Sequence, residues 1–252
     1  MGTPVRWGHE FLVNTTTASH QCEPAVTGLA DGRFVVAWTD ASQTDGDTSS
    51  WAVRAQVFNA DGTASGAEFL VNTTSANAQY APTIAALSGG GFVVVWTDES
   101  RSIGDRSGSA IRAQVFNADG STLGAEFRVN TSIFQAQLAP AITALTDGRF
   151  VVTWVDYSSA DGAIVPDLKG QVFEADGSAS GSEFLVNTNT TGFQREPTIT
   201  ARAGGTFVVA WEDYNPPGDG SLSGISARVF NSDGSTSGAA FLVNTSTDDY
   251  QI

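Results

Sequence analysis

The sequence predicts an all-β protein, a β-propeller whose four blades are each a four-stranded antiparallel sheet. Three observations predict it. One sequence unit of 57 or 58 residues fills the chain about four times. Each unit holds four short strand patterns separated by turn residues, and one of the four is apolar on both faces. No stretch has the 3.6-residue periodicity of a helix.

The repeat is defined by the string Phe-Leu-Val-Asn-Thr. It occurs at residues 11–15, 69–73, 184–188 and 241–245, with a variant at 127–131. A tryptophan and a proline keep the same spacing, at Trp38, Trp96, Trp154 and Trp211 and at Pro24, Pro82, Pro140 and Pro197. We therefore expect one domain over residues 1–252, with repeat units at approximately 16–73, 74–131, 132–188 and 189–245, an extra outer strand in 1–15, and the start of a further repeat in 246–252.

Within a unit the elements follow in a fixed order. A first strand follows the proline, as in residues 82–87, and an Asp-Gly or Gly-Gly pair predicts the hairpin turn after it. The second strand covers residues 33–38 and its copies. A variable loop of Asp, Ser and Gly separates it from the third strand, residues 53–58. After a second Asp-Gly turn, the Phe-Leu-Val-Asn-Thr string forms the fourth strand.

The second strand indicates how the units assemble. Phe34, Val36 and Trp38 lie on one of its faces, and Val35 and Ala37 lie on the other. A strand that is apolar on both sides must be covered on both sides. Neighbouring blades of a propeller provide this cover, so we expect the repeated tryptophans to lie in the core between blades.

The full pattern of proline, Asp-Gly, Phe-Val-Val-x-Trp, acidic loop, Gln-Val-Phe-Asn-Ala-Asp-Gly and Phe-Leu-Val-Asn-Thr resembles tandem repeats of large secreted bacterial proteins of the RTX and adhesin type. The resemblance covers nearly the whole chain and implies a secreted or cell-surface location, with no catalytic motif. The blades are also distantly similar to those of sialidase-type propellers. The turn at residues 59–63 lacks the Trp of a full Asp box, so the hairpin chemistry is similar but does not indicate a sialidase.

Charge and composition exclude several partners. The chain has 27 acidic and 12 basic residues and a formal net charge of −15. It therefore lacks the clustered Lys and Arg that nucleic acids and anionic membrane surfaces require. No apolar run is long enough for membrane insertion, and no signal peptide is recognised at the start. Cys22 is the single cysteine, so no internal disulfide forms.

The variable loops are the most acidic part of the chain. Carboxylates in glycine-containing turns are suitable ligands for Ca²⁺, so calcium is a possible cofactor. The candidate metal ligands are Asp40, Asp45, Asp47, Asp98, Asp105, Asp156, Asp161, Asp213 and Asp219. The spacing fits neither an EF-hand nor a nine-residue RTX repeat. The alternative is that these residues form ordinary solvated loops with Asx turns.

Three aromatic residues in or beside these loops are candidate glycan ligands: Trp51, Tyr157 and Tyr214. Arg54, Arg112 and Lys169 hold one position in the third strand. We expect them on the outer face, with their stems covering apolar surface, and a central anion site is the alternative.

These features favour a non-catalytic binding or structural module that contacts glycans or cell-surface polysaccharide, and no enzymatic activity. The alternatives are a propeller-scaffold glycoside hydrolase or lyase, and a spacer array without ligand. The repeat symmetry suggests no unique position for an active site. The fourth-strand string occurs five times, so residues 11–15 and 241–245 compete for one edge of a four-bladed ring. A surplus edge strand predicts a homodimer, and the incomplete repeats at the two ends predict that the chain is a fragment of a larger array.

Overall fold

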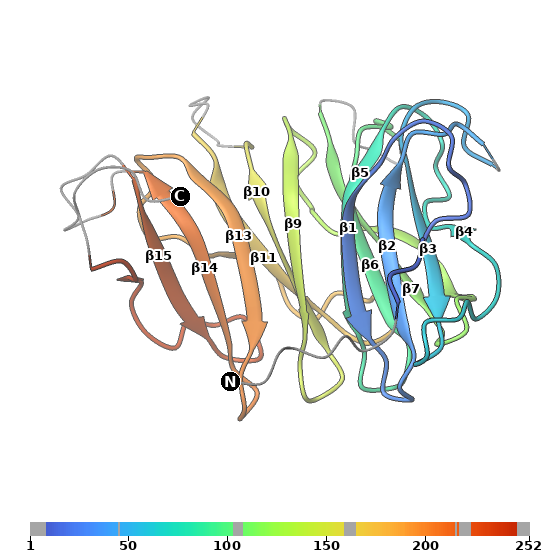
Figure 1. The fold of residues 1–252 in the computed structure, drawn as a ribbon. Helices are drawn as coiled ribbons and strands as arrows, with labels where there is room; N and C mark the ends of the chain where they lie inside the picture. Colours follow the sequence, from blue (N-terminus) through green and yellow to red (C-terminus); the bar gives the residue numbers. More distant parts are fainter. Residues whose placement is uncertain are drawn as a thin grey trace, which may run out of the picture.

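The computed structural model describes residues 9–44, 46–102, 108–158, 165–214, 216 and 223–245. These residues form four antiparallel sheets of four strands each, one sheet per sequence repeat, which confirms the predicted propeller class (Figure 1). In the described part of the chain there is no helix long and apolar enough to cross a membrane.

Each blade is a meander in which consecutive strands pair. Blade 1 contains β1 (Gln21–Gly28), β2 (Phe34–Asp40), β3 (Ala52–Phe58) and β4 (Phe69–Leu70). Blade 2 contains β5 (Gln79–Ala86), β6 (Phe92–Asp98), β7 (Ala110–Phe116) and β8 (Thr122–Arg128). Blade 3 contains β9 (Gln137–Ala144), β10 (Phe150–Asp156), β11 (Asp167–Phe173) and β12 (Phe184–Leu185). Blade 4 contains β13 (Gln194–Ala201), β14 (Phe207–Tyr214), β15 (Ser223–Phe230) and β16 (Phe241–Leu242).

The first strand of each blade begins before the proline, three residues earlier than the sequence predicts. A bulge interrupts its pairing at this point, for example between Cys22 and Ala25. A proline has no N–H to donate to the ladder, so a bulge lets the strand continue past it. The residue before the proline takes a positive φ in every blade, at Glu23, Ala81, Ala139 and Glu196.

The fourth strand ends before the Asn of its motif in all four blades, two residues into the predicted string, because that Asn pairs through its side chain. In blade 1 the backbone N–H of Val53 donates to Asn72 Oδ1 at 2.8 Å, where a strand would offer a carbonyl. The same bond recurs at Asn130, Asn187 and Asn244. The motif therefore ends the sheet instead of extending it.

The core lies between blades, as the doubly apolar strand predicts. We call the side of a blade that carries its tryptophan the Trp face, and the opposite side the Val face; in β6 these hold Trp96 and Val95. Three hydrophobic clusters each join the Val face of one blade to the Trp face of the next. All four repeated tryptophans are buried.

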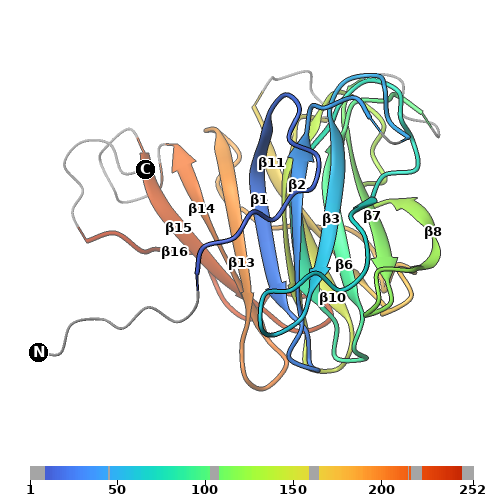
Figure 2. The ribbon, with the colours of Figure 1, turned by 45° about the vertical axis from the view of Figure 1, so that its right-hand side comes forward.

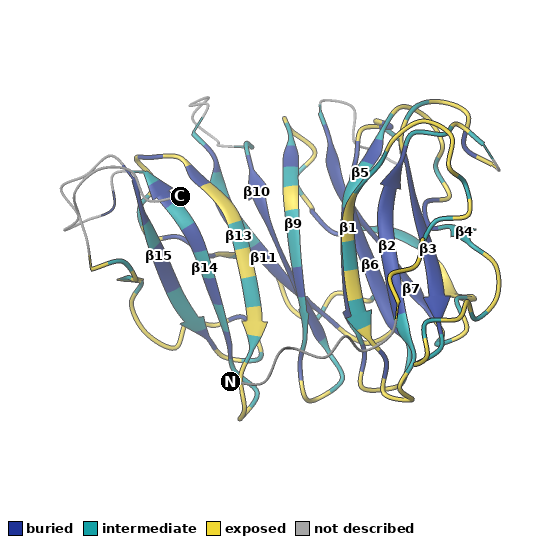
Figure 3. Cartoon of the chain, in the orientation of Figure 1, coloured by how far each residue is buried: buried dark blue, intermediate teal, exposed yellow. Residues whose placement is uncertain are grey.

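The order of the blades leaves one face open. The inner strands contact one another in the sequence β1, β5, β9, β13 (Figure 1). No hydrophobic cluster of the described residues joins blade 4 back to blade 1. Figure 2 shows β13, β14 and β15 of blade 4 side by side. Strands β6 and β10 are buried on both faces, whereas β14 alternates between buried and half-buried residues (Figure 3). The Val face of blade 4 is therefore uncovered.

The phenylalanine of each fourth-strand motif links its blade to the next one. Phe69 of blade 1 lies 5.5 Å from Phe116 of blade 2, and Phe116 stacks on Phe92 at 5.1 Å. A Cβ on Gly120, whose φ is +87°, would approach Phe69 to 2.9 Å. Gly120 therefore has two roles. It adopts the positive φ of the Asp-Gly turn, and its lack of a side chain leaves room for the Phe69 ring.

The N-terminal string is placed differently from the prediction. Phe11 packs against Phe58 of blade 1, and the backbone N–H of Thr15 donates to Glu68 of the same blade at 2.7 Å. Blade 4 is completed instead by β16, which pairs with β15. The N-terminal string therefore does not compete for the edge of blade 4, because it occupies the Trp face of blade 1. Dimerisation through a surplus strand stays a prediction.

We expect Trp96→Ala to lower the free energy of unfolding by about 3–5 kcal/mol, because it removes a fully buried ring from the core between blades 1 and 2. Trp51→Ala is the matched control: this ring is 41% exposed, and its loss should cost much less. Urea unfolding measures both. Equal and small losses would contradict the packing described above.

Candidate functional site

The aspartate two residues after each tryptophan is part of a buried polar network. In blade 2, Asp98 accepts hydrogen bonds from Gln79 Nε2 at 2.9 Å and from Ser100 Oγ at 2.6 Å. Arg112 Nε donates to the same carboxylate at 2.6 Å, and Arg112 Nη1 lies 3.2 Å from Glu126. The charge of Asp98 is therefore balanced within the protein.

Blades 1 and 3 repeat this Asp–cation–Glu network. Its members are Asp40, Arg54 and Glu68 in blade 1, and Asp156, Lys169 and Glu183 in blade 3. The prediction that the basic residues lie on an outer face is wrong for Arg54 and Arg112, which are buried. A guanidinium is buried here because carboxylates on both sides pair with it.

Blade 4 lacks the cation and the glutamate. Ser226 stands at the position of Arg112, and Ala240 stands at the position of Glu126. Asp213 is nevertheless buried, and it accepts from Ser226 Oγ at 3.0 Å and from Asn189 Nδ2 at 3.1 Å. Burial raises the pKa of Asp213, and the hydrogen bonds from Ser226 and Asn189 offset only part of that rise.

Asp156 of blade 3 shows the opposite shift. Burial alone would raise its pKa, but hydrogen bonds from Lys169 and Ser158, together with the Lys169 charge, lower it below the ordinary value. The two aspartates occupy equivalent positions. The presence or absence of a cation therefore decides the direction of the shift.

Within the described ranges, no three His, Cys, Asp or Glu side chains come together in a way that could hold a metal ion. Asp47 is buried and accepts from Ser49 and from Asn72. Four of the predicted ligands, Asp45, Asp105, Asp161 and Asp219, lie outside the described residues. Calcium binding stays a prediction.

The three predicted glycan-binding aromatics do not form one site. Trp51 is exposed just before β3 and meets Tyr80 edge-on, with ring centroids 6.2 Å apart. Tyr157 packs against the hydrophobic cluster between blades 3 and 4. Tyr214 ends β14 beside Phe193, and the Arg195 guanidinium lies 5.8 Å from the Tyr214 ring centroid.

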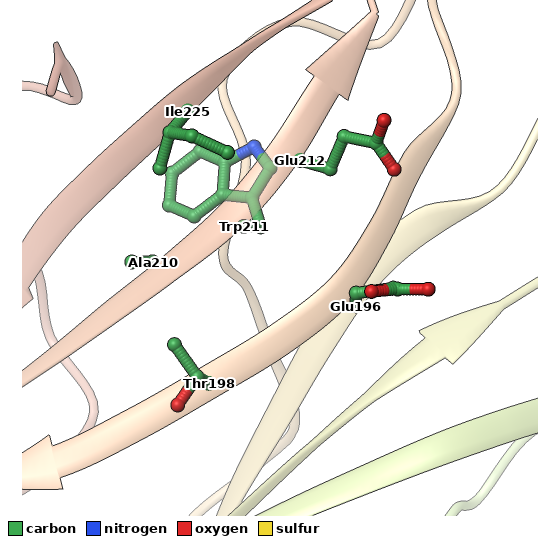
Figure 4. Close-up of a pocket in the computed structure, with 6 residues that line it drawn as sticks. All are labelled: Glu196, Thr198, Ala210, Trp211, Glu212 and Ile225. Atoms are coloured by element: carbon green, nitrogen blue, oxygen red, sulfur yellow. The ribbon is translucent and has the colours of Figure 1, made fainter. Parts of the chain in front are cut away.

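The open Val face of blade 4 carries a cavity of about 540 Å³ that contains two carboxylates. Glu196 comes from the bulge of β13, and Glu212 comes from β14 next to Trp211. Figure 4 shows the two side chains leaving neighbouring strands in the same direction. Thr198, Ala210 and Ile225 line the rest of the hollow. One carboxylate oxygen of Glu212, Oε1, is buried without a hydrogen-bond partner in the described part of the chain.

Glu212 departs from the repeat. The equivalent residues are Thr39, Thr97 and Val155, and a following blade covers each of them. In blade 1, Thr39 and Glu23 both accept from the backbone N–H of Ala81 in blade 2. A carboxylate in place of Thr39 would be costly under such a cover, because it would be buried beside the Glu23 carboxylate, which already accepts from Thr39 Oγ1 and from the Ala81 N–H. Glu212 is therefore compatible with an open face.

This pair was not predicted, because the repeat symmetry suggests no unique position for an active site. A signal was nevertheless present in the sequence: aligning the units on the tryptophan places Glu212 against two threonines and a valine. That Glu196 lines the same cavity could be seen only in the structure, because the bulge in β13 determines which residues of β13 and β14 share a face.

No protein-family model matches the sequence, and no curated protein matches it. Solved propeller structures are similar over most of the chain. A protein of unknown function from Dyadobacter fermentans DSM 18053 has a TM-score of 0.64 at 11% identity, covering 90% of this chain and 70% of that one. The GH93 α-L-arabinofuranosidase of Fusarium graminearum, solved with arabinobiose, has a TM-score of 0.59 at 11% identity and coverages of 92% and 69%. The α-L-arabinanase of Penicillium chrysogenum, also with arabinobiose, has a TM-score of 0.58 at 14% identity and coverages of 88% and 66%.

These findings correct the predicted function. The sequence favoured a non-catalytic module without enzymatic activity, whereas the similar structures of described activity are glycoside hydrolases. They agree with the alternative of a glycoside hydrolase scaffold. At these identities the similarity shows a propeller fold, and it gives no evidence for repeats of the RTX or adhesin type.

We expect Asp98→Asn to lower the free energy of unfolding by about 3–5 kcal/mol, because it leaves Arg112 charged and buried beside one carboxylate fewer. Asp213→Asn is the matched variant in blade 4, where no cation loses its partner, and it should cost far less. Chemical unfolding at neutral pH compares the two. A loss of stability for Asp213→Asn as large as that for Asp98→Asn would contradict the inference that only Asp98 balances a buried cation.

The pH dependence of stability should separate Asp156 from Asp213. A lowered pKa stabilises the fold above the ordinary aspartate value, and this contribution is lost as the pH falls through the folded pKa. A raised pKa favours the fold below the ordinary value, and this contribution is lost as the pH rises through the folded pKa. Below about pH 4, the ordinary aspartate value, we expect wild type to gain stability relative to Asp156→Asn as the pH rises. Above about pH 4, we expect it to lose stability relative to Asp213→Asn as the pH rises. Unfolding curves on both sides of this value measure the two differences, and slopes of the same sign would contradict the assigned shifts.

Proposed function

We propose that this protein is a glycoside hydrolase that acts on arabinose-containing glycans, with Glu196 and Glu212 as its carboxylate pair. The observation that carries the proposal is the cavity on blade 4, whose lining includes two carboxylates on an open face of the propeller. The fold similarity to arabinan-degrading enzymes supports the substrate class.

The geometry suits the chemistry of glycosidic bond cleavage. Such a reaction needs one carboxyl group to protonate the leaving oxygen and a second either to activate water or to attack the sugar carbon. The cavity volume of about 540 Å³ lies within the range of small-molecule sites. Ala210 and Ile225 offer apolar surface to a sugar ring, and Thr198 offers a hydroxyl for its polar edge.

The location outside the cell is also part of the proposal. It depends on the resemblance of the repeats to those of secreted bacterial proteins, and an extracellular setting is where a polymeric plant glycan would be met. The descriptions of the cavity and of the fold do not depend on the extracellular location.

Release of reducing ends from arabinan tests the activity. We expect Glu196→Gln and Glu212→Gln each to lower kcat by about 10²–10⁴-fold, the usual effect of removing a general acid or base. Glu174→Gln, at an exposed turn of blade 3, is the control and should keep full activity. Product analysis separates hydrolysis from a lyase reaction, which leaves an unsaturated sugar.

Two outcomes would overturn the proposal. The first is a wild-type protein that releases no sugar from arabinan or from arabinobiose. The second is activity that survives both Gln substitutions, since the carboxylate pair would then have no role. Thermal unfolding of each variant shows whether a loss of activity merely reports a loss of fold.

A further inference from the structure

A second hollow lies at the junction of blades 2 and 3, away from the Glu196–Glu212 cavity. It has a volume of about 550 Å³, and its lining includes Asn77, Tyr80, Glu99, Arg101 and Leu138. The lining is rich in hydrogen-bonding side chains. Such a mixture of aromatic, amide and charged groups in a hollow of this size is typical of a site for a polar small molecule.

The polar groups of the hollow are held in place by one another. The Tyr80 hydroxyl donates to Glu99 Oε1 at 3.3 Å, and Asn77 Nδ2 donates to the Glu99 backbone carbonyl at 3.2 Å. Burial, and then the Glu99 charge, raise the pKa of Tyr80 to about 12. Its hydroxyl therefore stays a neutral hydrogen-bonding group at any physiological pH.

Gly108 forms part of the wall of the hollow. A Cβ at this position would come within 2.3 Å of the backbone oxygen of Gln135. The glycine therefore lets the segment before β7 pass directly against the segment before β9. This close approach fixes the junction of blades 2 and 3 from which the polar groups project.

Trp51 is an exposed aromatic residue that contacts Tyr80, one of the residues lining this hollow. Its ring is 41% exposed and meets the Tyr80 ring edge-on at 87°, and its backbone oxygen accepts from Gln79 N–H at 2.8 Å. The equivalent positions in the other blades hold Ser109, Pro166 and Ser223. The combination of Trp51, Tyr80 and Glu99 therefore occurs once in the repeat array.

We infer that this surface, formed by Trp51, Tyr80 and Glu99, binds a neutral sugar unit of the glycan at a distance from the carboxylate pair. An aromatic ring with one open face packs against the apolar face of a sugar, and neighbouring polar groups bond to its hydroxyls. The hollow is lined by one carboxylate, Glu99, and one guanidinium, Arg101, so their charges balance and the site favours a neutral sugar over an anionic one. The inference extends the proposed function from bond cleavage to substrate binding, but it is tested by binding alone.

Titration calorimetry with arabinobiose, and affinity electrophoresis in gels that contain linear arabinan, provide the test. Both use the Glu212→Gln background, so that the probe is not consumed. We expect Trp51→Ala to weaken arabinan binding at least about tenfold, because it removes the aromatic face on which the sugar packs, and Glu99→Gln to weaken it by a smaller factor. Phe193→Ala removes another exposed aromatic, on blade 4, and should leave binding unchanged.

Binding and cleavage can fail separately. If wild type cleaves arabinan but Trp51→Ala binds it within twofold of the Glu212→Gln parent, the inference is wrong and the proposed function stands. If arabinan binds through Trp51 but no cleavage occurs, the proposed function fails and the inference stands. Stronger binding of polygalacturonate than of arabinan would overturn the neutral-sugar assignment.

Discussion

The structure depends on the packing of each Val face against the Trp face of the next blade. A single blade cannot cover its own middle strand, because Val93 and Val95 of β6 lie on one side while Phe92 and Trp96 lie on the other. Burial of both sides therefore requires two neighbours. This requirement sets the order of the blades, and it explains why the Val face of blade 4, which has no neighbouring blade among the described residues, is open.

The Phe-Leu-Val-Asn-Thr string is conspicuous in sequence because it acts at a joint between blades. In residues 69–73, Asn72 ends its own sheet, Phe69 packs on Phe116 of the next blade, and Thr73 donates to Glu126 of that blade. Three neighbouring positions thus make three different contacts, two of them with another repeat. A change at one would disturb the joint, whereas the loops between strands are free to vary.

The fold could be predicted from the sequence because every repeat carries the same signals for it. The period, the doubly apolar strand around Trp96 and the Asp-Gly turns all indicate stacked four-stranded units, and four copies carry the same signal. It was insufficient for the aspartates. An aspartate in a Ser- and Gly-rich loop suggests a metal ligand, but the partner of Asp98 is Arg112, fourteen residues later on an adjacent strand. Only the register of β6 with β7 brings the two together.

The fourth repeat departs from the others in several charges at once. It lacks the buried cation and glutamate of the network, with Ser226 and Ala240 in their places, and it gains Glu212 on the open face. These changes leave the buried Asp213 carboxylate of blade 4 without the cation that pairs with Asp98 in blade 2, where that cation is Arg112. A fold of repeats usually removes such defects, and the positions where a protein keeps them are commonly functional. Under the proposed function, blade 4 is the part of the propeller where stability is exchanged for chemistry, and Glu196 and Glu212 are the residues through which that chemistry would act.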